Sequence, residues 1–114
     1  MPEQFKAGAQ QAVGNLFAMY AEFLVLGYYF RLAPPNLATV HFLVMPVPPA
    51  MVDGVVVQPN DERLLFDATE LAAVDQPRPD DYVVQSSNGL RRDVITAHLD
   101  VTGTMWAMVA RKVL

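Results

Sequence analysis

The sequence predicts a mainly β protein: a small antiparallel β-barrel or sandwich with one N-terminal α-helix. The N-terminal region carries a helical repeat of apolar residues, and the rest consists of short runs rich in Val, Thr, Tyr and Phe separated by Pro, Gly, Asn and Asp. A chain of 114 residues is also in the size range of one hydrophobic core. We therefore expect a single domain over residues 1–114, with a helix at about 4–24 and a β-rich body over 26–114.

The apolar residues of the predicted helix recur at three- and four-residue steps, which places them on one face. They are Phe5, Ala9, Ala12, Val13, Leu16, Tyr20, Phe23 and Leu24. Gly8 and Gly14 lie inside the same segment, and each costs up to about 1 kcal/mol relative to alanine. The helix should therefore depend on docking against the β-rich body.

Strand-like runs follow the helix, separated by residues that favour turns. The runs lie near 26–32, 39–44, 54–58, 64–71, 82–85, 93–99 and 104–111. Asn88-Gly89 supplies the positive φ angles of a tight hairpin turn, and residues 100–103 resemble a second turn. Prolines cluster at 34–35, 46–49 and 77–79, which we expect to be loops or strand ends because proline cannot donate to a strand ladder.

The composition is more apolar and less charged than that of an average domain, with 53% hydrophobic and 18% charged residues. We expect part of this apolar excess to lie in protein contacts. The most apolar stretch, residues 16–30, contains Glu22 and Gly27 and is followed by Arg31, which argues against a membrane-spanning helix. The N-terminus lacks the pattern of a secretion signal, so we expect a soluble protein with no membrane partner.

The absence of cysteine excludes disulfides, thiolate catalysis and cysteine-ligated metal sites. The net charge is −4, and apart from Arg91-Arg92 and Arg111-Lys112 the basic residues are scattered. Nothing forms the basic stripe that would neutralise a run of phosphates. A single copy should therefore not bind nucleic acid tightly.

No catalytic pattern emerges from the remaining polar residues. His41 and His98 lie in strand-like runs without metal-ligand spacing, and a partly buried or edge histidine is the favoured interpretation of both. Ser86 and Ser87 flank the Asn-Gly turn without a nucleophile motif, and no two carboxylates are singled out by spacing. Without a phosphate loop or a calcium loop, we expect neither an enzyme nor a cofactor.

The segment 46–60 is the candidate interaction site, because it combines stiff prolines with apolar side chains. Its candidate contact residues are Pro46, Pro48, Pro49, Met51, Val55, Val56 and Val57. Such an apolar loop is usually covered, either by its own domain or by another subunit, and the two interpretations are equally favoured.

Three further residues are possible interface residues. Trp106 could anchor an interface, although a core position is favoured for a tryptophan in the last strand of a small barrel. Arg91 and Arg92 could meet a carboxylate or phosphate of a partner, although a solvated hairpin is the favoured explanation.

The C-terminal half resembles the head–tail joining proteins of tailed bacteriophages, in particular the head-closure or stopper type. The resemblance lies in FDATEL at 66–71, PRPDDYVV at 77–84, DVI at 93–95, LDVTGTMW at 99–106 and VAR at 109–111. In that family a proline-introduced turn brings in a strand, and a closing hairpin ends in an aromatic strand and an arginine. Residues 21–24 and 27–29 resemble the point where the family's helix gives way to its first strand, so the likeness covers about two thirds of the chain.

The resemblance implies a small β-barrel with a helix, assembled as a ring of about six or twelve copies with head-to-tail interfaces. Such a ring belongs to the neck of the virion, is assembled in the host cytoplasm, and extends and gates the DNA channel. Its partners would be further copies of itself, a portal or adaptor protein, and a tail terminator or tail-tube protein. DNA would pass without sequence-specific binding, and segment 46–60 would be the gating or docking loop.

Two alternatives remain. A tail terminator or other tail-completion protein is also a ring of small subunits. From a different class, a small barrel-type ligand-binding module would line a pocket with Trp106, Tyr82 and the apolar strands.

Overall fold

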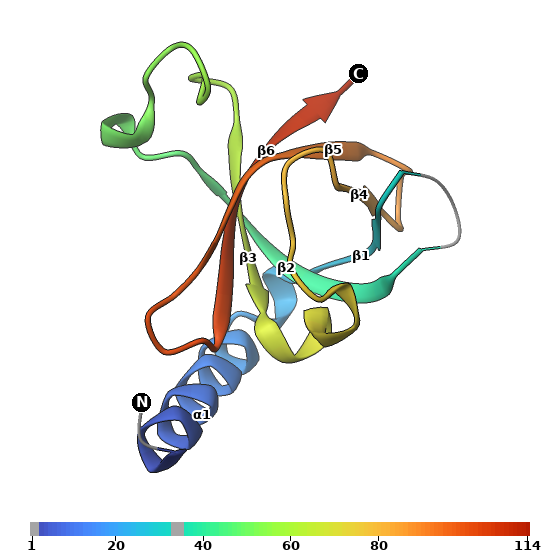
Figure 1. Cartoon of the computed structure of the whole chain (residues 1–114). Helices are drawn as coiled ribbons and strands as arrows, with labels where there is room; N and C mark the ends of the chain where they lie inside the picture. The colour runs from blue at the N-terminus through green and yellow to red at the C-terminus, as the bar shows by residue number, and fades with distance from the viewer. Residues whose placement is uncertain (1–2, 33–35) are drawn as a thin grey trace.

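The computed structural model describes residues 3–32 and 36–114, with side chains from residue 8 onward, so Pro34, Pro35 and the Phe5 side chain lie outside the description. A helix, α1 (Glu3–Met19), is followed by the strands β1 (Val25–Phe30), β2 (Ala38–Pro46), β3 (Glu62–Asp67), β4 (Tyr82–Gln85), β5 (Arg91–Leu99) and β6 (Met105–Val113) (Figure 1). Among the described residues, 3₁₀ turns lie in the connections from α1 to β1, from β2 to β3 and from β3 to β4: η1 (Ala21–Phe23), η2 (Pro49–Met51) and η3 (Ala68–Val74).

The strands form a closed antiparallel barrel in the order β1-β2-β3-β6-β5-β4. β1 pairs with β2 on one side and with β4 on the other, which closes the sheet on itself. This confirms the predicted fold class and selects the barrel over the sandwich. Closure leaves no strand of the barrel with a free edge along its paired length.

The inside of the barrel is a packed core, because inward-facing residues of every strand meet there. The buried members of this core are Tyr29, Val40, Phe42, Leu64, Phe66, Leu71, Val74, Val83, Val94, Met108 and Ala110. Leu71 and Val74 come from η3, which covers the end of the barrel where β3 finishes and β4 begins.

A charged group occupies the opposite end of the barrel. Arg92 is only 6% exposed, with its Nε 3.0 Å from Glu62 Oε1 and its Nη1 3.0 Å from Gln85 Oε1. The expectation of a solvated hairpin is therefore wrong for Arg92, because alternation along β5 directs it inward with Val94. Arg91, one residue earlier, is exposed as expected.

Helix α1 packs on the outer wall of the barrel. Val13 and Phe17 form a second cluster with Leu43 of β2 and Leu65 of β3. The helix ends at Met19, several residues before the predicted end, since the chain turns through η1 so that Val25 can pair with Phe42. The predicted helix–body docking is confirmed, but Phe23 is exposed beyond the helix end.

Two strand predictions need correction. Residues 54–58 form no strand, because hydrogen bonds to Asp53 fold them into a compact turn. The run 64–71 begins earlier, in β3, and ends at Asp67, whose Oδ1 accepts the Thr69 N–H at 3.0 Å and begins η3. The turn predictions hold, since Gly89 and Gly103 have φ angles of 70° and 73°.

Gly27 in β1 provides a test of barrel closure. A Cβ at this position would stand 2.8 Å from the Val84 carbonyl oxygen and 2.9 Å from Phe42 Cε1. We expect Gly27→Ala to lower the free energy of unfolding by about 1–3 kcal/mol, because neither the β4 backbone nor the packed ring can easily move aside. Denaturant titration measures the change. Gly14→Ala is the matched control, since nothing lies within 4 Å of that position and alanine favours helix. An unchanged Gly27→Ala protein would contradict this close approach.

Candidate interaction site

The loop between β2 and β3, residues 47–61, folds back over the outer wall of the barrel. Val47 and Val57 are buried against Val109 of β6, and Val52 and Ile95 pack around them. This part of the loop is covered by its own domain, which was one of the two expected arrangements. Val57 is therefore a structural residue and not a free contact residue.

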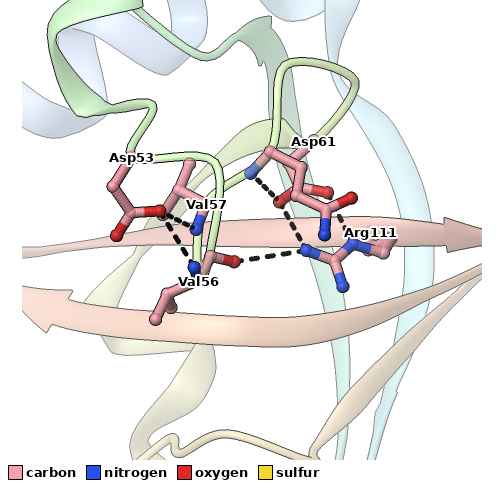
Figure 2. Close-up of polar contacts among 6 residues, drawn as sticks. Asp53, Val56, Val57, Asp61 and Arg111 are labelled. Atoms are coloured by element: carbon pink, nitrogen blue, oxygen red, sulfur yellow. Dashed lines mark hydrogen bonds and ion pairs between the residues drawn. The ribbon is translucent and has the colours of Figure 1, made fainter.

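Asp53 fixes the conformation of the loop tip. Its Oδ1 accepts hydrogen bonds from the backbone N–H groups of Val55, Val56 and Val57, each at 2.9 Å. The N–H groups of Asp53 and Gly54 donate in turn to the Val57 carbonyl, at 3.2 and 3.0 Å. The N–H groups of the three valines hold the pKa of Asp53 below its ordinary value, and the hydrogen bond from Val55 contributes most. Figure 2 shows the carboxylate facing the amides of Val56 and Val57.

An ion pair between a buried aspartate and a partly exposed arginine ties the base of the loop to β6. Asp61, 4% exposed, accepts from Arg111 Nε at 2.8 Å and from Arg111 Nη2 at 3.0 Å. Arg111 Nη2 also lies 3.2 Å from the Val56 carbonyl oxygen (Figure 2). The Gln58 N–H donates to Asp61 Oδ2. The hydrogen bonds from Arg111 are the main reason that the pKa of Asp61 is lowered. The loop is thereby fixed at its tip and at its base.

The fixed loop presents two valines to solvent, which we call the valine knob: Val55, 81% exposed, and Val56, 49% exposed. Met51 in η2 is exposed as well, as are Pro46 at the end of β2 and Pro49, whereas Pro48 is half-buried. Isolated apolar side chains on a surface need no explanation, but an apolar pair held out by a dedicated hydrogen-bond network is suited to contact another surface.

An apolar groove lies elsewhere on the barrel wall, between the end of α1 and the strands β2 and β3. Its volume is about 440 Å³, and we call it the helix groove; it is lined by Leu16, Tyr20, Phe23, Leu43, Val44, Met45 and Leu65. Sequence reasoning missed it because the repeat of apolar residues assigned Tyr20 and Phe23 to the docked helical face. The available signal was the length of that repeat, which runs to Leu24 and so continues past the end of α1 at Met19.

The other predicted interface residues are not part of these two surfaces. Arg91 donates to Asp93 at 2.7 Å, and its guanidinium carbon lies 3.8 Å from the centroid of the Tyr82 ring. Tyr82 stacks on Phe30 with ring centroids 4.9 Å apart. Trp106 is partly buried against the barrel core, in agreement with the favoured core position.

The histidines and carboxylates form no metal-binding group in the part of the chain that is described. His41 Nδ1 lies 2.9 Å from Glu70 Oε2, and Glu70 Oε1 accepts the His41 N–H, so His41 is an exposed histidine of β2 with one carboxylate partner. Within residues 3–32 and 36–114, no three His, Asp or Glu side chains are grouped so that they could hold a metal ion. No helix among the described residues is long and apolar enough to cross a membrane.

Comparison with known proteins leaves the family open. No family model matches the chain, and no curated protein sequence matches it significantly. The head-closure resemblance thus remains a prediction from the sequence.

The role of Asp53 can be tested by hydrogen exchange. We expect Asp53→Ala to remove the protection of the Val55, Val56 and Val57 amides, because their shared acceptor is lost. Asp53→Asn is the matched control, since its carbonyl oxygen can still accept those bonds, and it should retain part of the protection. Amide exchange followed by NMR measures both variants. Equal exchange in wild type and Asp53→Ala would show that the loop is fixed by other contacts.

The Asp61–Arg111 pair predicts a pH dependence of stability. Because the pKa of Asp61 is lowered in the folded state, its contribution is present above the ordinary aspartate pKa of about 3.9 and is lost as pH falls through the folded value. We expect Asp61→Asn to be less stable at pH 7 and to lose stability less steeply between about pH 5 and pH 2. Denaturant titrations across this range measure the slope, with Arg111→Lys as an intermediate case. Parallel curves for wild type and Asp61→Asn would contradict the lowered pKa.

Proposed function

We propose that the chain is a structural subunit of the head–tail connector of a tailed phage, of the head-closure type. It assembles with copies of itself into a ring between the portal or adaptor protein and the tail, where it extends and gates the DNA channel. The resemblance in the sequence suggests this class. The observation that carries the proposal is the presence, on one small closed barrel, of a fixed valine knob and an apolar groove on different parts of the wall.

The valine knob and the helix groove are suited to pair between neighbouring copies. The loop carrying the knob packs over β5 and β6, whereas the groove lies along β2 and β3, and the two surfaces share no residue. A contact between different patches on two copies is head-to-tail, and it closes into a ring when the rotation permits. Full burial of a valine side chain stabilises by about 1.5 kcal/mol or more, and the contact repeats at every interface of the ring.

Because the core fills the interior of the barrel, DNA could not pass through a single subunit. The channel of the proposed ring would therefore lie between subunits. DNA would pass through the centre of the ring, and the net charge of −4 disfavours retention of its phosphates. The fixed conformation of the loop favours docking over movement as the role of segment 46–60.

One observation favours a second candidate, the ligand-binding module. The helix groove, at about 440 Å³, is in the size range of small-molecule sites. The site would then be this groove and not the expected pocket of Trp106 and Tyr82, since Tyr82 is covered by Phe30 and Arg91. A small molecule retained on purification would favour this candidate.

The double variant Val55→Ser/Val56→Ser tests the ring proposal without disturbing the buried Val57. We expect it to fold normally and to assemble at least about tenfold more weakly, because two buried valines are lost at each contact. Light scattering over a concentration series measures assembly, with and without the portal complex and, separately, the tail-tube protein. Val101→Ser is the matched control, since Val101 is 92% exposed in the turn before β6.

The partner that the chain binds distinguishes the head-closure type from a tail terminator. Binding to the portal complex supports the head-closure type, whereas binding to the tail tube alone supports a tail terminator. A strict monomer that binds neither, or unchanged assembly of the double variant, would overturn the ring contact proposed here.

A further inference from the structure

A second, smaller cavity lies on the outer wall beneath η2, and nothing in the preceding proposal uses it. Its volume is about 170 Å³, and its lining includes Met51, Arg63, Thr96, His98, Ala107 and Val109. Apart from Met51, these residues come from β3, β5 and β6. The inference drawn from this cavity is independent of the ring.

Strand register brings the polar residues of the cavity together. Arg63 is paired with Val109, which is paired in turn with Thr96, so the three lie side by side across β3, β6 and β5. His98 follows Thr96 two positions along β5 and is paired with Ala107. A guanidinium, a hydroxyl and an imidazole therefore border one apolar hollow.

Arg63 is the unusual member of this group. Its Nε is buried and has no hydrogen-bond partner among the described residues. A buried donor without a partner is rare in folded proteins and calls for a missing acceptor. Four other arginines each donate their Nε to a carboxylate of this chain: Arg31 to Asp81, Arg91 to Asp93, Arg92 to Glu62 and Arg111 to Asp61.

We propose that this cavity binds a carboxylate from outside the chain, with a short apolar body. The guanidinium of Arg63 receives the carboxylate in the fork geometry that these groups favour, and Nε, which is buried in the free chain, becomes one of the two donors when the carboxylate binds. Thr96 and His98 supply further donors, and Met51, Ala107 and Val109 contact the carbon atoms next to the carboxylate. The carboxylate is either an Asp or Glu side chain of a second copy or a free short-chain acid.

The test uses NMR of the whole ¹⁵N-labelled chain, with propionate as the probe and chloride at equal ionic strength as the reference. We expect propionate to shift the Arg63 Nε–H resonance in a saturable way, with the resonance assigned by its loss in Arg63→Lys. The Arg63→Lys protein should bind propionate at least about tenfold more weakly, followed through the Thr96 and His98 amides. Thr96→Val should weaken binding about threefold while leaving Arg63 in place. Arg91→Lys is the matched control and should bind like wild type, because Arg91 lies over Tyr82.

The source of the carboxylate follows from a dilution series of the Val55→Ser/Val56→Ser protein without propionate, because that variant lacks the proposed ring contact. A concentration-dependent shift of the Arg63 Nε–H resonance identifies a side chain of a second copy, and a shift only on adding propionate identifies a free acid. Either result supports the carboxylate site. A resonance that responds to neither dilution nor propionate, that responds equally to chloride, or that responds to phosphate but not to propionate would overturn it.

Discussion

The pairing of β1 with β4 is the constraint on which the rest of the structure depends. It gives β1 a partner on each side and converts the sheet into a closed barrel. The position needs Gly27, since the β4 backbone and the Phe42 ring leave no space for a side chain. Once the barrel is closed and its interior filled, the remaining apolar residues can only lie on the outer wall. Helix α1 covers one part of that wall and the β2–β3 loop covers another.

Much of this fold could be predicted from the sequence because it follows from local rules. The alternation of strand residues, the glycines of the two hairpin turns and the helical repeat all act within a few residues of the chain. The errors arise where a side chain overrides the local preference. Residues 54–58 have the β-branched composition of a strand, but the carboxylate of Asp53 captures their amides first. Arg92 was expected in solvent, whereas Glu62 and Gln85 make an inward position favourable.

The candidate sites were predictable only in outline. Composition identified segment 46–60, but it could not separate the buried Val57 from the exposed Val55 and Val56, because the three residues are chemically identical. The helix groove depends on where α1 stops, which is set by the entry of Val25 into the barrel. Arg63 gives no signal in the sequence at all, since its distinction is that no carboxylate of the described residues accepts from its Nε, as one does for the other arginines named above.

Asp53 fixes the backbone path of its loop without fixing which side chains the loop presents to solvent. The carboxylate binds backbone N–H groups, which every residue except proline possesses, so the path of the loop does not depend on the side chains at positions 55 and 56. Those two positions can therefore vary among related proteins without refolding the loop. A new partner could be accommodated by changing two side chains on an unaltered scaffold. Under the ring contact proposed above, divergence at these positions beside a retained aspartate would record a change of the contacted surface and not a loss of structure.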